Sequence, residues 1–219
     1  MQRHQQHRDG HYHHDRLDNR AGQATFIRAD GVQFVGSAEV SGNTLAVTVN
    51  GYSDFPSTFS DGSTYGIGTV NGTVTTGAMI SASLDFTTNG GSAISGTWSL
   101  TFEALSDNSS STAAISGNYT DAVTGAVLSI TSLGAMTSQN PSNGCVLNGS
   151  VATSDPAHDL YEVAYTYEDC TGTYLSLNGV QFTGLASLNT NLSPAQITMA
   201  VSGASATGKY AIVSTLNGS

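Results

Sequence analysis

The run 154–159 (SDPAHD) is the part of the sequence whose residue types best suit acid–base chemistry. His158 is the only histidine in residues 21–219, and serines and aspartates lie beside it. A histidine with an acid and a hydroxyl is the residue set of a hydrolase triad. However, the chain contains no Gly-x-Ser-x-Gly nucleophile elbow, and a histidine in an exposed loop beside a turn is a far commoner occurrence. A hydrolase that uses His158 is therefore one hypothesis, and no catalytic residue is predicted.

Paired glutamates are the residues that glycoside hydrolysis would use, with carboxyl groups about 5–10 Å apart. Glu162 and Glu168 share a strand face, but six residues of extended chain separate them by about 20 Å. Glu39 and Glu103 could form such a pair if the fold brought them together. Solvent-exposed strand faces explain all four residues more simply.

A metal site is conceivable in the first 20 residues, which hold five of the six histidines. His11, His13 and His14 are the tightest group, and neutral imidazoles bind nickel, copper or zinc. A tail without fixed geometry would bind such an ion weakly, so an unstructured leader is the alternative. Apart from this site we expect no cofactor.

Cys145 and Cys170 form an even pair with 24 residues between them. In a chain of secreted character such a pair predicts a disulfide, which would contribute about 3.5 kcal/mol on the chain-entropy model. Two buried free thiols are the alternative. A zinc site is less favoured because no second ligand pair stands nearby.

The composition indicates strands and turns and an acidic surface. The chain has 29 Ser, 27 Thr and 25 Gly against six Lys and Arg. Residues 21–219 carry 13 acidic residues against Arg28 and Lys209. Such a surface repels phosphate backbones and anionic lipid headgroups, so a nucleic-acid partner is not expected. No run of about 18 apolar residues occurs, so no transmembrane helix is expected either.

Alternating apolar residues identify the strands that would position any site. Three sets each share one strand face and are expected in the core: Leu45, Val47 and Val49; Ile80, Ala82, Leu84 and Phe86; and Trp98, Leu100 and Phe102. Turns are predicted at Asn50-Gly51, Asp61-Gly62, Asn71-Gly72, Asn89-Gly90-Gly91 and Asn178-Gly179. Successive hairpins predict an all-β antiparallel meander that closes as a β-barrel, with a two-sheet sandwich as the alternative.

The segment 155–168 fits either a helix or a strand. Leu160, Val163 and Tyr167 would lie on one helical face, with Ser154 as a candidate N-cap. The alternation of Tyr161, Val163, Tyr165 and Tyr167 favours a strand, because tyrosine and valine are common in strands. We therefore predict a strand. The domain organisation expected is a His/Arg-rich tail over residues 1–20 and one all-β domain over residues 21–219.

The second half of the chain resembles the C-terminal part of certain bacterial envelope lipoproteins. The shared order is a Gly-Cys strand (143–151), a Tyr-x-Val strand (159–163), a second cysteine (Cys170) and a Gly-Leu-Ala strand (184–188). The resemblance covers about residues 143–215 and implies a periplasmic or surface β-barrel-like protein with paired cysteines and no assigned activity. Members of that family begin with a signal and a lipid-accepting cysteine, whereas the first cysteine here is Cys145.

Three functions follow as hypotheses. The first is a non-enzymatic cell-envelope or secreted module with a structural, adhesive or ligand-binding role, whose ligand would be small and apolar or a carbohydrate. The second is a self-assembling filament or surface-layer subunit, in which residues 1–20 add a strand to a neighbouring copy. The third is the hydrolase with His158. An extracytoplasmic location is expected from the composition, the cysteines and the resemblance, although residues 1–20 lack the apolar segment of a signal peptide.

Overall fold

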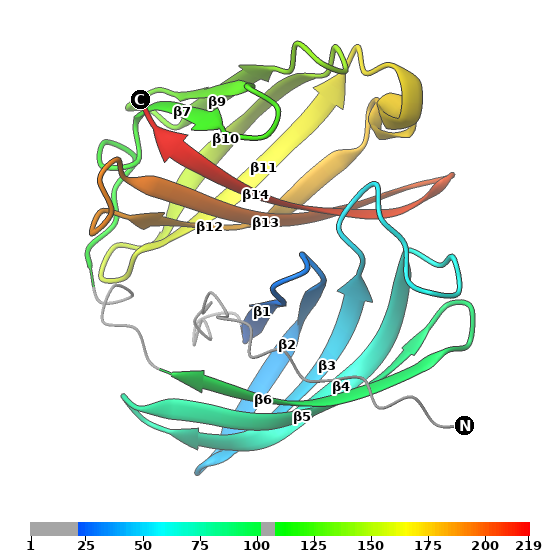
Figure 1. Cartoon of the computed structure of the whole chain (residues 1–219). Helices are drawn as coiled ribbons and strands as arrows, with labels where there is room; N and C mark the ends of the chain where they lie inside the picture. Colours follow the sequence, from blue (N-terminus) through cyan, green and yellow to red (C-terminus); the bar gives the residue numbers. More distant parts are fainter. Residues whose placement is uncertain (1–21, 102–107) are drawn as a thin grey trace.

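The computed structural model describes residues 22–101 and 108–219, which form two antiparallel sheets (Figure 1). Strands β1 to β6 form a six-stranded sheet in chain order, and the remaining strands close an eight-stranded barrel in the order β10-β11-β12-β13-β14-β7-β8-β9. The prediction of an all-β fold with a closed barrel is confirmed. The structure adds that the barrel is built from the second half of the chain, while the first half forms a sheet of its own.

The strands follow one another with short connections. The six-stranded sheet contains β1 (Gln23–Ile27), β2 (Gln33–Ser41), β3 (Thr44–Tyr52), β4 (Tyr65–Thr75), β5 (Met79–Thr88) and β6 (Ala93–Thr101). The barrel contains β7 (Gly117–Asp121), β8 (Val127–Ile130), β9 (Ala135–Gln139), β10 (Val146–Asp155), β11 (Leu160–Glu168), β12 (Gln181–Asn189), β13 (Gln196–Ser205) and β14 (Gly208–Gly218). A 3-10 helix, η2 (Gly172–Leu177), connects β11 to β12. None of the helices in the described part of the chain is long and apolar enough to span a membrane.

The six-stranded sheet curls around its own apolar core. Leu45, Val47 and Val49 alternate with exposed residues along β3 and are buried in that core. Phe26 on the edge strand β1 and Trp98 on the opposite edge strand β6 have ring centroids 5.2 Å apart. The inner face of the sheet is therefore covered by its own side chains, although its two edge strands do not pair.

The residues predicted for this core lie where the alternation places them. Leu84, Phe86 and Trp98 are buried, and Leu100 is half-buried against the same cluster. Phe102 lies outside the described residues.

Two of the predicted turns were wrong. Asn50-Gly51 lies within β3 and Asn71-Gly72 within β4. Both glycines face the inside of the curled sheet, where a Cβ on Gly51 would lie 2.4 Å from the Phe86 ring and one on Gly72 would lie 2.2 Å from the carbonyl oxygen of Ser81. These glycines serve the close approach of neighbouring strands rather than a reversal of the chain.

The barrel has a filled interior. Tyr161, Phe182 and Ile197 are fully buried inside it, together with Met136 from β9. Residues 160–168, the main part of the segment that fitted either a helix or a strand, form strand β11. This strand pairs with β10 and β12, so the prediction of a strand is confirmed. Large side chains thus occupy the centre of the barrel.

The β3–β4 loop (residues 53–64) of the six-stranded sheet makes hydrogen bonds to strand β14 of the barrel. The Phe55 N–H donates to the carbonyl oxygen of Ala211 on β14 at 2.9 Å, and Thr64 Oγ1 donates to the carbonyl oxygen of Lys209 at 3.1 Å. In the middle of the loop, Phe59 packs on Phe86 in the core of the six-stranded sheet, with ring centroids 5.5 Å apart. The loop therefore places one phenylalanine in its own sheet and carries another to the barrel.

Candidate ligand-binding site

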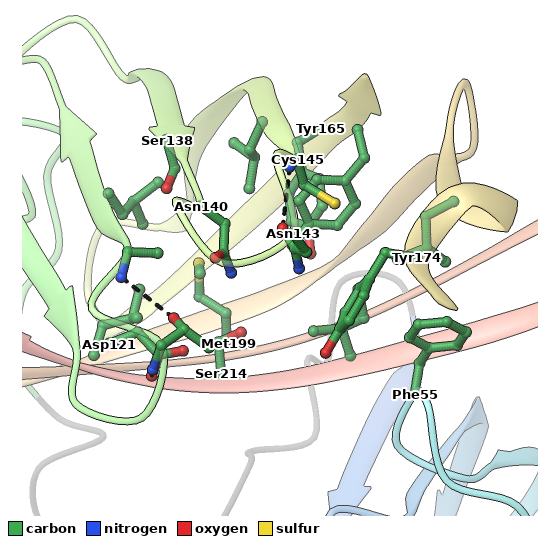
Figure 2. Close-up of a pocket in the computed structure, with 18 of the residues that line it drawn as sticks. Phe55, Asp121, Ser138, Asn140, Asn143, Cys145, Tyr165, Tyr174, Met199 and Ser214 are labelled. Carbon is green, nitrogen blue, oxygen red and sulfur yellow. Dashed lines mark hydrogen bonds between the residues drawn. The ribbon is translucent and has the colours of Figure 1, made fainter. Parts of the chain in front are cut away.

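A pocket of about 260 Å³ lies at one end of the barrel (Figure 2). Its wall combines the β7–β8 turn, the β9–β10 turn, helix η2 and the β3–β4 loop. We call it the mouth pocket. Because the β3–β4 loop belongs to the six-stranded sheet, both sheets contribute to this site.

Four aromatic rings line the mouth pocket. Phe55 meets Tyr174 of η2 edge-to-face with ring centroids 5.4 Å apart, and Figure 2 shows the two rings side by side at the mouth. Tyr165 and Tyr167 of β11 also line the pocket, with their centroids 5.1 Å apart. Burial raises the pKa of Tyr165 well above its ordinary value, so this phenol stays neutral at physiological pH.

Two carboxylates line the mouth pocket. Asp54 Oδ1 accepts a hydrogen bond from the Val213 N–H at 2.9 Å. Burial raises the pKa of Asp54, and the bond from Val213 opposes this effect. Asp121 Oδ1 accepts the N–H groups of Val123 and Thr124 at 2.7 and 3.0 Å, which fixes the β7–β8 turn. None of the described residues that line the pocket is basic.

The disulfide holds the rim beside these groups. Cys145, before β10, is bonded to Cys170, after β11, so the prediction of a disulfide is confirmed. Asn143 Oδ1 accepts the Cys145 N–H at 3.0 Å, and the Asn143 carbonyl oxygen accepts the Thr171 N–H at 2.9 Å. Asn140 and Asn143 both line the pocket, and Figure 2 shows them projecting from the β9–β10 turn. Their position therefore depends on a turn that the disulfide fixes.

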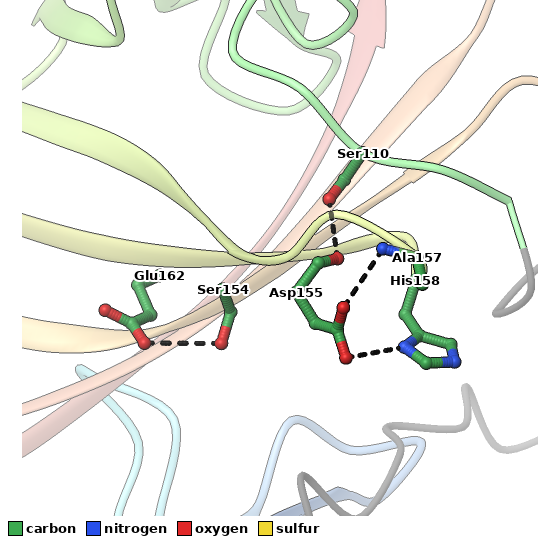
Figure 3. Close-up of polar contacts among 6 residues, drawn as sticks. All are labelled: Ser110, Ser154, Asp155, Ala157, His158 and Glu162. Atoms are coloured by element: carbon green, nitrogen blue, oxygen red, sulfur yellow. Dashed lines mark hydrogen bonds and ion pairs between the residues drawn. The ribbon is translucent and has the colours of Figure 1, made fainter. Parts of the chain in front are cut away.

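The run with His158 lies away from the mouth pocket, in the β10–β11 turn (Figure 3). His158 Nδ1 lies 2.9 Å from Asp155 Oδ2, so the acid and the base of a triad do meet. The nearby hydroxyls are directed elsewhere, because Ser110 donates to the Asp155 carbonyl oxygen and Ser154 donates to Glu162. Within residues 22–101 and 108–219 no hydrogen bond joins a serine hydroxyl to the imidazole, so the geometry gives the hydrolase hypothesis no support.

The other candidate residues lie partly outside the described residues. Glu162 and Glu168 are both exposed on β11, and the proposed metal ligands His11, His13 and His14 lie outside the described residues, as does Glu103. No group of three or more His, Cys, Asp or Glu side chains in the described part of the chain could hold a metal ion.

The sequence reasoning did not identify the mouth pocket. Two features of the sequence could have pointed to this pocket: the tyrosines of β11 close to Cys170, and the two asparagines in the turn before Cys145. Nothing local marks Asp54 and Phe55, because their role depends on a contact with residues far along the chain.

No protein-family model, curated protein sequence or solved structure matches this chain. The resemblance to bacterial envelope lipoproteins therefore stays a prediction.

Proposed function

We propose that this protein is a non-enzymatic binding module of the bacterial cell envelope or of the secreted proteins, and that it holds a small ligand in the mouth pocket. The observation that carries the proposal is the wall of this pocket, which combines four aromatic rings with amides, hydroxyls and two carboxylates. Small-molecule sites combine apolar and aromatic surface with placed polar groups, and this wall contains both.

The size of the pocket limits the ligand. Its volume of about 260 Å³ is slightly below the range of about 300–1,000 Å³ that is typical of sites for drug-sized molecules. The centre of the barrel is filled by Tyr161, Phe182 and neighbouring side chains, so a long acyl chain would find no space there. The ligand we expect is a single small molecule or one terminal group of a larger one.

An extracytoplasmic location fits this proposal. The Cys145–Cys170 disulfide is of the kind that persists in oxidising compartments such as the periplasm or the cell exterior. Thiol titration of the denatured protein, purified without reductant from its native source, tests this part. Two free thiols would contradict an extracytoplasmic location.

Ligand binding can be tested by thermal unfolding with panels of neutral sugars, organic cations and organic anions at millimolar concentration. A ligand that binds the folded state raises the melting temperature. The increase should disappear in Ser214→Trp, which fills the pocket, and should persist in Leu133→Trp, which changes an exposed residue of the β8–β9 turn. If no compound of any panel acts on the wild type, or if Ser214→Trp responds as the wild type does, the proposal is wrong.

A second candidate function is self-assembly, and the edges of the six-stranded sheet favour it. Strands β1 and β6 each pair on one side within the described residues, which leaves backbone donors and acceptors on the other side. The occupant we consider is residues 1–20 of a second copy, whose four arginines suit the acidic body. Deletion of residues 1–20 should then abolish assembly, and an unchanged particle size in light scattering would exclude this function.

A further inference from the structure

We infer that the mouth pocket selects a small organic cation of the alkylammonium class, with Asp54 and Asp121 as counter-charges and the rings of Phe55 and Tyr174 around its alkyl groups. This inference rests on the proposed ligand-binding function and names the chemical class of the ligand. Three features of the pocket support it.

The first feature is charge. Asp54 and Asp121 line the pocket, and none of its described lining residues is basic. The two basic residues of the described part of the chain do not line the mouth pocket: Arg28 pairs with Asp30 and lines a neighbouring pocket that also includes Asp54, and Lys209 Nζ lies 4.3 Å from the centroid of the Tyr65 ring. An anionic ligand would meet two carboxylates without compensation, whereas a cation would be attracted by both.

The second feature is the environment of Asp54. This carboxylate is half-buried, and among the described residues the Val213 N–H is the one group that donates a hydrogen bond to it. A carboxylate in such a place is stabilised by a positive charge nearby. A cation in the mouth pocket would provide such a charge on the side of Asp54 where no described lining residue is basic.

The third feature is the aromatic wall. The faces of aromatic rings carry partial negative charge and attract ammonium groups, most strongly where water is excluded. Phe55, Tyr165, Tyr167 and Tyr174 all line this small pocket, and Phe55 packs edge-to-face on Tyr174. A neutral sugar could also contact such rings, but it would leave the two carboxylates without counter-charge.

Isothermal titration with choline chloride and with its uncharged isostere 3,3-dimethyl-1-butanol tests the inference, because the two probes differ in charge and hardly in shape. We expect choline to bind at least about tenfold more tightly than the isostere, in keeping with the strength of cation–π contacts and ion pairs in partly desolvated sites. Tetramethylammonium should bind as well, and glucose and acetate should not.

Single substitutions test whether the two carboxylates of the mouth pocket are responsible for the preference for choline. Asp54→Asn and Asp121→Asn keep an acceptor oxygen for their backbone N–H donors, and each should weaken choline binding by about fivefold. Asp85→Asn, on an exposed position of β5, makes the same change of charge away from the pocket and should bind as the wild type does. Circular dichroism of each variant checks that it is folded.

The outcomes separate the two proposals. Equal binding of choline and the isostere, or preference for glucose, would overturn the inference while the binding function stood. Equal affinity of Asp54→Asn, Asp121→Asn and Asp85→Asn for choline would also overturn it. If none of the probes and none of the wider panels binds, both proposals fail.

Discussion

The rings of Phe26 and Trp98 contact each other across the gap between the two edge strands of the six-stranded sheet, with centroids 5.2 Å apart. This contact closes the apolar core of the sheet where no backbone pairing does so. Phe26→Ala should lower the free energy of unfolding by about 3–5 kcal/mol, as large truncations in a core do. Trp98 is the only tryptophan, so its emission should also shift to the red in native buffer.

Urea unfolding followed by the fluorescence of Trp98 measures both effects. The matched control is Ile67→Ala, because Ile67 is 64% exposed on the same sheet and should change stability by less than about 0.5 kcal/mol. Equal stability of the two variants would contradict the role given to Phe26.

Glycines inside the strands provide a second test. A Cβ on Gly72 would lie 2.2 Å from the carbonyl oxygen of Ser81, whereas a Cβ on Gly96 would meet nothing within 4 Å. Gly72→Ala should therefore destabilise the protein by about 1–3 kcal/mol, because the two strands must move apart. Gly96→Ala should be neutral or stabilise by up to about 1 kcal/mol, since it restricts the unfolded chain. Chemical denaturation of the pair gives the comparison, and a Gly72→Ala variant as stable as Gly96→Ala would show that the strand spacing adapts.

The local sequence pattern was sufficient to predict the strands, but it was not sufficient to predict how the strands assemble into sheets. Leu45, Val47 and Val49 alternate with polar residues, and a strand buries one face in any sheet, so their burial follows from sequence. The Asn-Gly pairs at 50–51 and 71–72 have the residue types of tight turns. Their glycines are instead required because a Cβ there would clash with a neighbouring strand, and no local pattern in the sequence reveals that contact. For the same reason the division of the strands into two sheets was not predicted.

The candidate site was even less predictable from the sequence than the assembly of the strands. The Cys145–Cys170 disulfide was predictable because the chain has two cysteines and one way to pair them. The mouth pocket was not, because it requires Phe55 of one sheet to reach Tyr174 of the other. His158 and Asp155 are close in sequence and do meet, yet the nearby serines bond to other groups.

Removal of the disulfide should weaken the barrel more than the six-stranded sheet. Cys145→Ser with Cys170→Ser releases a cross-link over 25 residues, which the chain-entropy model values at about 3.5 kcal/mol. The loss should appear in urea unfolding followed by far-UV circular dichroism, with the native emission of Trp98 unchanged. Loss of the native Trp98 emission would instead show that the six-stranded sheet depends on the rim of the barrel.

The same variant bears on the ligand-binding proposal. Asn143 is held by the Cys145 N–H and by Thr171, so the rim of the mouth pocket should loosen when the cross-link is absent. Affinity for any ligand found with the wild type should decrease by about tenfold or more, because the wall is no longer held in place before binding. Unchanged affinity would place the ligand away from the β9–β10 turn.

Asp159 gives a prediction about pH. It is buried in the β10–β11 turn and accepts the Leu188 N–H at 2.9 Å. Burial raises its pKa from 3.8 to about 6, and its charge is one cause, after burial, of the raised pKa of Tyr161. Because the folded state holds the proton more tightly than the unfolded chain, this group stabilises the fold fully below about pH 3.8, and the stabilisation is lost as the pH rises through 6.

Asp159→Asn removes this titration while an amide oxygen remains for the Leu188 N–H. Relative to the wild type, the variant should gain about 1–3 kcal/mol of unfolding free energy between pH 4 and pH 8. Denaturation at both pH values measures the gain independently of any constant cost of the amide. Asp85→Asn, on an exposed strand position, controls for the change in net charge. A difference between Asp159→Asn and the wild type that does not vary with pH would show that folding does not raise the pKa of Asp159.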